Sequence, residues 1–375
     1  MTVAIVRAIG RALDKQDLSR AEMAEVVGQI MDGQATAAQI GGLLVALRAK
    51  GEAVDELVGA AAAMRSRATP LVCPHPERGI DTCGTGGDGA GTINVSTLAA
   101  ILIAACGGVV AKHGNRAQSS KCGSADVLEA LGVSTDADPK IVERCMAMAN
   151  IGFAFAPRFH AATRHAGGPR KELGTRTIFN LLGPLTNPAN VKHQVVGVYD
   201  RRWCEPVAAA LGALGLRRAA VVHGAGGLDE IAVRGETHVA LWDADEGGVR
   251  VLAIAPKTFG VGELDPEGLA GGDAPHNAGI LRKVLAGHGV GRGEPLEAVL
   301  RAGAMTAALG LELLESGGLE AARLPEQYKR AAASVQDGAA RLVLHKWREL
   351  SQDVADPNDW RELMALEPSA FAGVE

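Results

Sequence analysis

The residues with the clearest potential for chemistry lie in the stretch GTGGDGAGTINVST, residues 84–97. A glycine-rich turn between a strand and a helix lets several backbone N–H groups point at one anion, and the positive end of the helix dipole adds to that attraction. Ser96 and Thr97 can cap the helix or donate their hydroxyl hydrogens to a phosphate oxygen. The spacing matches neither the dinucleotide-binding G-x-G-x-x-G pattern nor the Walker loop. Taken alone, the stretch could equally be a tight turn.

A second stretch, AKHGNRAQSSKCGSAD at residues 111–126, combines cationic side chains with hydrogen-bond donors. Its potentially cationic side chains are Lys112, His113, Arg116 and Lys121, and its interleaved polar ones are Asn115, Ser119, Ser120 and Ser124. This composition suits a polyphosphate, although a solvated basic loop would have the same composition. Both loops are expected at the carboxyl ends of strands, where α/β sheets bind their ligands, so together they indicate one anion site.

Two adjacent acids, Asp229 and Glu230, follow a strand-like segment in the stretch GAGGLDEIAV, residues 224–233. Mg²⁺ prefers one or two carboxylates together with the phosphates of a substrate, so this pair is a candidate magnesium site. The alternative is a helix start, because acids are favoured in the first turn of a helix.

The segment 157–190 is dense in arginine and histidine. Arg164, Arg170 or Arg176 could bind a carboxylate through two parallel hydrogen bonds. The alternative for each of them is a structural salt bridge.

The elements that must position these residues alternate between strands and helices. Short strands are expected at residues 80–83, 108–114, 193–200 and 218–224, with helices at 96–106 and 125–132 among them. This alternation predicts an α/β fold with a central, mainly parallel sheet.

The N-terminal part has a different pattern and reads as short helices. Ser19 and Glu22 form a capping-box pattern at the start of one of them. We expect an all-helical domain at residues 1–70, an α/β domain at 71–345, and a tail at 346–375 to which the sequence assigns no role. The proline-rich residues 68–79 are a candidate hinge between the domains.

Length and composition exclude several classes of protein. The chain has 375 residues, 47% of them hydrophobic, and a net charge of -5, which does not favour a nucleic-acid or membrane-surface partner. The start lacks a secretory pattern, no segment is long and apolar enough to span a membrane, and the six cysteines lack metal-type spacing, so we expect a cytoplasmic protein.

Four stretches, in this order, resemble the anthranilate phosphoribosyltransferase family: GTGGDGAGTINVST, KHGNRAQSSKCGSADVLEALG, RKELGTRTIFNLLGPLTNPA and GGLDE. The resemblance covers about residues 15–310 and includes the N-terminal helical segment. It implies a small helical domain to which residues 170–190 return, a larger α/β domain, an active site between the two, and a homodimer formed through the helical part. The implied reaction joins anthranilate to the ribose of phosphoribosyl pyrophosphate (PRPP), with Mg²⁺ as cofactor and release of pyrophosphate, in tryptophan biosynthesis.

The resemblance also implies roles for individual residues. The PRPP site would be lined by Gly84, Gly87, Asp88, Thr92, Asn94, Val95, Ser96, Thr97, Lys112, His113, Gly114, Asn115, Arg116, Ser119, Ser120 and Ser124. Mg²⁺ would be bound by Ser96, Asp229 and Glu230. Anthranilate would contact Gly84, His113, Asn115, His160 and Arg170. Lys112 would support the leaving pyrophosphate, and no residue would act as a strong general base because an aryl amine is already nucleophilic.

Three positions depart from the family pattern: Pro169, His276 and Arg301. They affect the expected C-terminal packing and, for Pro169, the preference for the aryl substrate. Cys122, inside the second loop, is expected to be a small space-filling side chain, and the alternative is a reactive thiol that blocks the site when modified.

Two rival functions remain open at this point. A pyrimidine nucleoside phosphorylase resembles this family in fold, but a Ser-Gly is expected there after the Lys-His, where this chain has Gly-Asn-Arg. A catalytically silent homologue that binds nucleic acid would be basic and would lack both the GTGGDG loop and the Asp-Glu pair.

Overall fold

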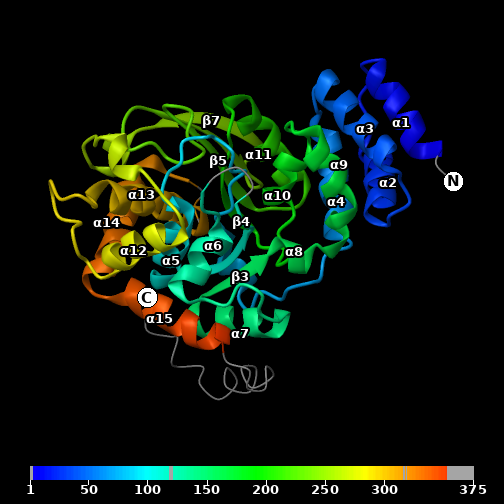
Figure 1. Cartoon of the computed structure of the whole chain (residues 1–375). Coiled ribbons are helices and arrows are strands. Elements are labelled where there is room, and N and C mark those ends of the chain that lie inside the picture. Colours follow the sequence, from blue (N-terminus) through cyan, green and yellow to red (C-terminus); the bar gives the residue numbers. More distant parts are fainter. Residues whose placement is uncertain (1–2, 118–120, 316, 318, 353–375) are drawn as a thin grey trace.

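The computed structural model describes residues 3–117, 121–315, 317 and 319–352, and shows a helical bundle beside a larger α/β part (Figure 1). The bundle consists of four helices: α1 (Val3–Leu13), α2 (Arg20–Met31), α3 (Ala37–Lys50) and α4 (Val54–Arg65). The predicted capping box is confirmed, since the Ser19 hydroxyl accepts from the backbone N–H of Glu22 and the Glu22 carboxylate accepts from that of Ser19. Gly51, with φ 94°, ends α3.

One seven-stranded sheet, in the order β3-β2-β1-β4-β5-β6-β7, forms the centre of the α/β part. Its strands are β1 (Gly79–Asp81), β2 (Val109–Gly114), β3 (Ile151–Phe155), β4 (His193–Gly197), β5 (Arg218–Gly224), β6 (Thr237–Asp243) and β7 (Gly248–Ile254). The strands from β3 to β5 are parallel, and β6 and β7 are added antiparallel as a hairpin. The predicted fold class is therefore confirmed, whereas the sequence analysis did not identify β3 or this hairpin.

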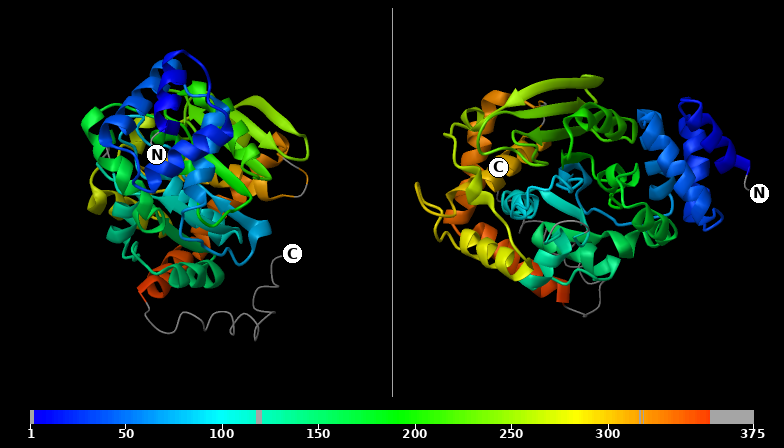
Figure 2. Two further views of the ribbon diagram at one scale, coloured as in Figure 1. Left: turned by 90° about the vertical axis from the view of Figure 1, so that its right-hand side faces the viewer. Right: turned by 45° about the horizontal axis from the view of Figure 1, so that its top comes forward.

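Helices cover both faces of the sheet (Figure 2). The helices that follow the bundle in the chain are α5 (Val95–Ala105), α6 (Ser124–Leu131), α7 (Pro139–Ala149), α8 (Ala156–Phe159), α9 (Arg164–Leu173), α10 (Phe179–Leu185), α11 (Cys204–Ala213), α12 (Ala274–Leu285), α13 (Glu297–Leu314), α14 (Leu324–Gln336) and α15 (Ala339–Gln352). Short 3-10 turns are η1 (Pro76–Arg78), η2 (Ala161–Thr163), η3 (Arg201–Trp203), η4 (Pro256–Phe259), η5 (Pro266–Leu269) and η6 (Ala321–Arg323). None of the helices in these described ranges is long and apolar enough to cross a membrane.

The alternation of side chains along the strands divides the core into two layers. Val195 and Ala220 face a core shared with α5 and α13, whereas Val196 and Val221 face the opposite side. That second core continues through α11 into the helical bundle, where it includes Leu57 of α4. Burial of apolar surface therefore joins the bundle to the sheet, and the two parts are not separated by a polar gap.

The segment between β3 and β4 returns to the bundle, because α9 packs against α2 and α3 while α10 packs against α4 and α11. At the other end of the chain, α15 packs on α5 and α7 and buries Trp347, so regular structure continues past residue 345. The exact domain limits at residues 70 and 345 stay a prediction.

Candidate functional site

The glycine-rich stretch connects β1 to α5 at the carboxyl end of the sheet, as expected. Gly86, Gly87, Gly89 and Gly91 have φ between 62° and 81°, a region that other residues rarely adopt. The backbone N–H of Thr85 donates to the carbonyl oxygen of Gly197 (2.8 Å). The loop is therefore held against the end of β4 in a conformation that requires glycine.

The second half of this loop lies against a segment before α12. The backbone N–H of Ile93 donates to the carbonyl oxygen of Leu269 (2.8 Å), and Thr92 forms a β-bridge with Ala270. The side-chain amide of Asn94 donates to the carbonyl oxygen of Cys122 in the second loop (3.3 Å). The structure thus brings the first and second loops together, as the sequence predicted.

In the second loop, Arg116 faces carboxylates of its own chain. Its guanidinium forms ion pairs with Asp126 (3.1 Å) and Glu129 (2.5 Å), and these pairs hold its pKa above the ordinary value. Asn115 is exposed, and its carbonyl oxygen accepts from the Ser124 hydroxyl (3.3 Å). Ser119 and Ser120 lie outside the described residues.

The third loop carries Asp229 and Glu230 in a turn after β5, so the alternative of a helix start is wrong. Oε1 of Glu230 accepts from the backbone N–H of Ser96 at the first turn of α5 (3.1 Å). The backbone N–H of Asp229 donates to Oδ2 of Asp88 in the first loop (3.4 Å). Side chains from the first and third loops therefore meet at one point above the sheet.

The surroundings of Asp229 and Glu230 disfavour their charged forms. Burial raises the pKa of Asp229, and the neighbouring Asp88 raises it further. Burial also raises the pKa of Glu230, with a further contribution from Asp229. Carboxylate oxygens that repel one another in a half-buried site are a donor set that fits a hard divalent cation, and the Ser96 hydroxyl adds an oxygen beside them.

Lys112 lies beneath this cluster and is only 1% exposed. Its Nζ lies 3.3 Å from the Ser96 hydroxyl oxygen and 3.3 Å from the carbonyl oxygen of Thr82. Burial lowers its pKa, while the negative charges of Asp81 and Glu230 oppose that effect. These two carboxylates favour the charged form of Lys112, which can act on the site from behind.

The two histidines of the site are buried and neutral. Burial lowers the pKa of His113 to about 3 and that of His160 to about 4. Their ring centroids are 5.2 Å apart, and Nε2 of each ring has no hydrogen-bond partner among the described residues. Nδ1 of His113 lies 3.0 Å from the carbonyl oxygen of Gly183 and must donate to it, so Nε2 keeps a free lone pair.

Arg170 lies on α9 with its guanidinium 5.1 Å from the centre of the Phe179 ring. It is half-buried, and its burial lowers its pKa. Within the described ranges it has no acidic partner. Arg176, by contrast, donates to the carbonyl oxygen of Gly87, and its guanidinium carbon lies 4.0 Å from the centre of the Tyr199 ring. It therefore connects the first loop to Tyr199, which follows β4.

Several other predicted residues contribute backbone or packing only. Thr97 is fully buried and its hydroxyl has no partner in the part of the chain that the structure describes, and Val95 is 1% exposed. A Cβ on Gly84 would come within 3.2 Å of the carbonyl oxygen of Gly197, and one on Gly114 would overlap the Ser124 hydroxyl. A side chain at Gly84 or Gly114 would therefore press on neighbouring atoms, so both positions favour glycine.

The departures from the family pattern are accommodated locally. Pro169 lies inside α9, next to Arg170. The backbone N–H of His276 is capped by the Asp273 carboxylate at the start of α12 (3.0 Å), and Arg301 pairs with Glu297 on α13.

Cys122 is buried, and its thiol has a pKa raised to about 11 by that burial. This supports the expected space-filling role over a reactive thiolate.

The sequence analysis missed two features of the site. Gly197 ends β4, and a Cβ there would overlap the carbonyl oxygen of Asp229, so the close approach of the third loop depends on this glycine. Asp81, at the end of β1, is a fully buried carboxylate below the site. A polar or glycine residue at the last position of a parallel strand could have signalled both.

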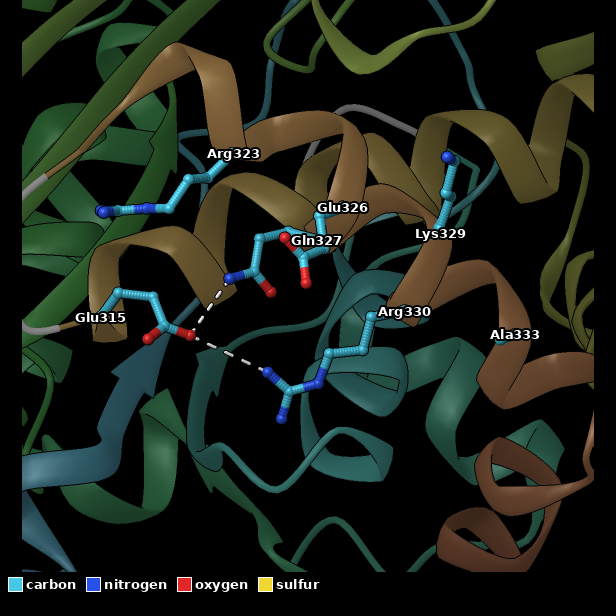
Figure 3. A pocket seen from close by; sticks show the side chains of 7 residues that line it. All are labelled: Glu315, Arg323, Glu326, Gln327, Lys329, Arg330 and Ala333. Carbon is cyan, nitrogen blue, oxygen red and sulfur yellow. Dashed lines mark hydrogen bonds and ion pairs between the residues drawn. The ribbon is translucent and has the colours of Figure 1, made fainter. Parts of the chain in front are cut away.

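A separate pocket of about 580 Å³ opens between α14 and the C-terminal end of α13 (Figure 3). Within it, the Glu315 carboxylate accepts from the side-chain amide of Gln327 (3.1 Å) and lies 3.9 Å from the guanidinium of Arg330. Arg330 donates to the carbonyl oxygen of Cys106, at the opposite end of α5 from the glycine-rich loop. The eleven residues of α5 place this pocket roughly 16 Å from the loops.

Comparison with known proteins identifies the relatives of this chain. A model of the "Glycosyl transferase family, a/b domain" matches residues 77–341, and one of the "Glycosyl transferase family, helical bundle domain" matches residues 6–68. An anthranilate phosphoribosyltransferase from Anaeromyxobacter dehalogenans (strain 2CP-C) is 51% identical over 342 residues, which cover 91% of this chain and 97% of the relative.

Two solved structures have the same fold over almost the whole chain. The anthranilate phosphoribosyltransferase of Thermus thermophilus is 40% identical with a TM-score of 0.82, covering 92% of this chain and 99% of that one. The enzyme of Saccharomyces cerevisiae, solved in complex with PRPP and Mg, is 27% identical with a TM-score of 0.82, covering 94% and 98%.

Proposed function

The chain belongs to the anthranilate phosphoribosyltransferase family, and we infer that it transfers the phosphoribosyl group of PRPP to the amine of anthranilate and releases pyrophosphate. It is a pentosyltransferase of tryptophan biosynthesis. The resemblance expected from the four motifs is thereby confirmed, and no feature of the described residues favours either rival function.

The observation that carries the proposal is the oxygen cluster where the first and third loops meet. Ser96, Asp229 and Glu230 would hold Mg²⁺ there, because burial and a neighbouring carboxylate (Asp88 for Asp229, Asp229 for Glu230) raise the pKa values of both acids and a divalent cation would relieve this. When bound, the cation would neutralise charge on the pyrophosphate as it leaves.

PRPP would lie across the first two loops, with its phosphates against backbone amides and the polar side chains of the second loop. The proposed contacts are Gly84, Gly87, Asp88, Thr92, Asn94, Val95, Ser96, Thr97, Lys112, His113, Gly114, Asn115, Arg116, Ser119, Ser120 and Ser124. For Thr97 and Val95 the burial of the side chain leaves the backbone as the contacting group. Arg116 would exchange a carboxylate of its own chain for a phosphate.

Anthranilate would bind between the α/β part and α9. Arg170 is suited to its carboxylate, because the guanidinium is half-buried beside Phe179 and without an acidic partner in the part of the chain that the structure describes. Nε2 of His113 and of His160 would accept hydrogens of the amine, since both rings are neutral and both Nε2 atoms are unpartnered among the described residues. Gly84 and Asn115 would complete this site.

The reaction depends on the orientation of the two substrates and on positive charge near the pyrophosphate more than on a general acid or base. Cleavage of the bond between ribose C1 and pyrophosphate leaves a cationic sugar carbon and sends an electron pair to the departing oxygen. Lys112 stabilises the negative charge that develops, from a position that needs no reorganisation. The aryl amine is unprotonated near neutral pH, so its nitrogen lone pair forms the bond to C1 as the C1–O bond breaks, and the proton that the nitrogen then loses passes to the released pyrophosphate or to water. Correct orientation therefore accounts for much of the rate.

Further proposals concern assembly and location. We propose a homodimer formed through the helical bundle, supported by the exposed apolar side chains of Val6, Leu13 and Val45 on α1 and α3. A cytoplasmic location, a hinge at residues 68–79 and the absence of nucleic-acid and membrane partners stay predictions.

The decisive experiment follows anthranilate by its fluorescence. The purified protein, supplied with anthranilate, PRPP and Mg²⁺, is expected to consume anthranilate only when all three are present, and a chelator should stop the reaction. Folded protein that leaves anthranilate unchanged would contradict the proposal. A parallel assay with a pyrimidine nucleoside and inorganic phosphate tests the rival phosphorylase activity.

A further inference from the structure

The carboxylate of Asp81, the last residue of β1, lies below the site in the middle of the sheet and is fully buried. Its Oδ1 accepts from the backbone N–H of His113 (3.1 Å). Its Oδ2 accepts from the side-chain amides of Asn187 (2.7 Å) and Gln194 (3.3 Å). A buried carboxylate is tolerated only when it is well bonded, so three donors from three different segments hold this side chain in one orientation.

The partners of this carboxylate extend to the helix on the anthranilate side. The side-chain amide of Gln194 also donates to the carbonyl oxygen of Pro184 (2.8 Å), and Nδ1 of His113 donates to that of Gly183 (3.0 Å). Asn187 lies two residues after the end of α10 in the chain. The C-terminal end of α10 is therefore tied to β1, β2 and β4 through the buried carboxylate and its direct partners.

The other end of α10 carries Phe179, which lies under the guanidinium of Arg170. On the donor side, His113 follows Lys112 along β2, and Asn187 donates to the carbonyl oxygen of Ala111 on the same strand (2.7 Å). One hydrogen-bond network thus spans from the strand that carries the donor-binding lysine to the helix on which the acceptor-binding arginine rests.

We infer that Asp81 is a positioning residue that fixes the α9–α10 segment, and with it the bound acceptor, against the end of β2 where the phosphoribosyl donor lies. The inference rests on the proposed function, because it concerns the mutual placement of that reaction's two substrates. Substrates held by different elements react only when the elements keep their spacing, and an error of about 1 Å can lower the rate roughly a hundredfold.

A metal site is the alternative use of this carboxylate, since ligand atoms of Asp81, Cys83 and His113 lie within 4.8 Å of one another. Both oxygens of Asp81 already accept hydrogen bonds, and burial raises the pKa of the Cys83 thiol, which donates to the carbonyl oxygen of Gly84 (3.6 Å). The buried cation Lys112 lies close enough to interact with both Asp81 and Cys83. A second cation would be repelled there, so hydrogen bonding is the role that the geometry supports.

The test replaces Asp81 with asparagine, which keeps the size of the side chain. Whichever way the new amide turns, its NH₂ group faces another donor, so the network is broken at one end. We expect Asp81→Asn to lower kcat/KM for anthranilate about ten- to a hundredfold. The Kd of PRPP with Mg²⁺, measured by calorimetry, should change less than about threefold, because the loops that bind PRPP keep their own contacts.

A double-mutant cycle distinguishes one connected network from two separate defects. Gln194→Leu removes the Gln194 hydrogen bonds to Asp81 and to Pro184. We expect the Asp81→Asn/Gln194→Leu double variant to lose at least about threefold less kcat/KM for anthranilate than the product of the two single losses, a coupling that independent sites do not show. If Asp81→Asn does not fold, Gln194→Leu, which removes only the Gln194 hydrogen bonds, decides by the same comparison of the two substrates.

The matched control is Asp243→Asn, because Asp243 is also a buried carboxylate on this sheet and pairs with Arg218 (3.0 Å) on its remote side. It should lower the melting temperature without changing kcat/KM for anthranilate. Wild-type kcat/KM in the folded Asp81→Asn variant, a Kd of PRPP weakened by the same factor as kcat/KM for anthranilate, or the same loss in the control would overturn the inference. A folded wild-type protein without any turnover would instead refute the proposed function, and the inference with it.

Discussion

The close approach of the third loop to β4 predicts that Gly197→Ala disables the metal site. An added Cβ would overlap the carbonyl oxygen of Asp229, which must retreat by more than about 1 Å before the two atoms are 3.0 Å apart. The obstacle is backbone and cannot rotate away. Asp229 and its neighbour Glu230 must therefore move relative to Ser96, whose backbone N–H lies 3.1 Å from the Glu230 carboxylate.

A displacement of this size predicts a loss of about a hundredfold in kcat, since errors near 1 Å in a reacting site have that effect. The concentration of Mg²⁺ needed for half-maximal activity should rise as well, because the oxygen ligands no longer converge. The overpacking itself should reduce the free energy of unfolding by about 1–3 kcal/mol. Anthranilate fluorescence gives kcat across a magnesium titration, and thermal unfolding gives the stability.

Gly212→Ala provides the control for overpacking. A Cβ at Gly212 on α11 would overlap the ring of Trp242 on β6, away from the loops. We expect a comparable loss of stability there with unchanged kcat and magnesium requirement. If Gly197→Ala folds and keeps kcat within about threefold of wild type, or if both variants lose activity equally, the argument from the Asp229 carbonyl is wrong.

Three further predictions concern binding, pH and thiol reactivity. Arg170→Ala should raise KM for anthranilate about 10- to 100-fold with little change in KM for PRPP, because charge-assisted hydrogen bonds are worth about 1.5–3 kcal/mol. Equal effects on both KM values would mean that Arg170 has a structural role. Asp229 and Glu230 have pKa values raised to about 7 and about 8 in the folded protein. The stability that they contribute in protonated form is therefore lost as the pH rises from the ordinary carboxyl range through those values. The melting temperature of the metal-free wild type should fall between about pH 5 and 8 relative to that of the Asp229→Asn/Glu230→Gln variant, and parallel curves of melting temperature against pH would exclude this. The Cys122 thiol, with its pKa of about 11, should react slowly with alkylating reagents at pH 7, which mass spectrometry of the labelled site can check. Rapid labelling of Cys122 with loss of activity would support the reactive-thiol alternative.

The sequence predicted the elements that carry strong local signals. The glycine-rich loop, the Lys-His strand and the capping box at Ser19 each depend on residues close together in the chain, and the structure confirms their conformations. The parallel sheet followed from the alternation of strands and helices. The hairpin of β6 and β7 was missed because its strands follow no helix and because β7 is exposed or half-buried at every position except Ile254, which leaves it without a clear apolar pattern.

The parts of the site that depend on distant contacts could not be predicted in this way. The Asp81 network joins residues about one hundred positions apart, and neither its donors nor its acceptor has a local pattern. Gly197 could not be predicted either, because it is needed only where the backbone of Asp229 passes close to its Cα. Lys112 was expected among the phosphate contacts, and only the packing reveals that it lies beneath Ser96.

The way in which the two parts of the molecule are joined limits how the site can close over its substrates. The apolar core runs without interruption from α4 through α11 to the sheet, and large apolar interfaces resist rigid rotation. Rotation at residues 68–79 would also have to break the backbone hydrogen bonds from Thr69 to Phe159 (2.9 Å) and from Leu71 to Pro188 (3.3 Å).

The exposed contacts of Arg176 can rearrange at much lower cost. Arg176 bridges the two parts of the molecule, since its carbonyl oxygen accepts from Arg48 of the bundle (2.8 Å) and its guanidinium donates to Gly87 of the first loop. Both contacts are exposed and bury little apolar surface. We therefore expect exclusion of water from the activated ribose to depend more on the approach of this arginine and the first loop than on movement of a whole domain.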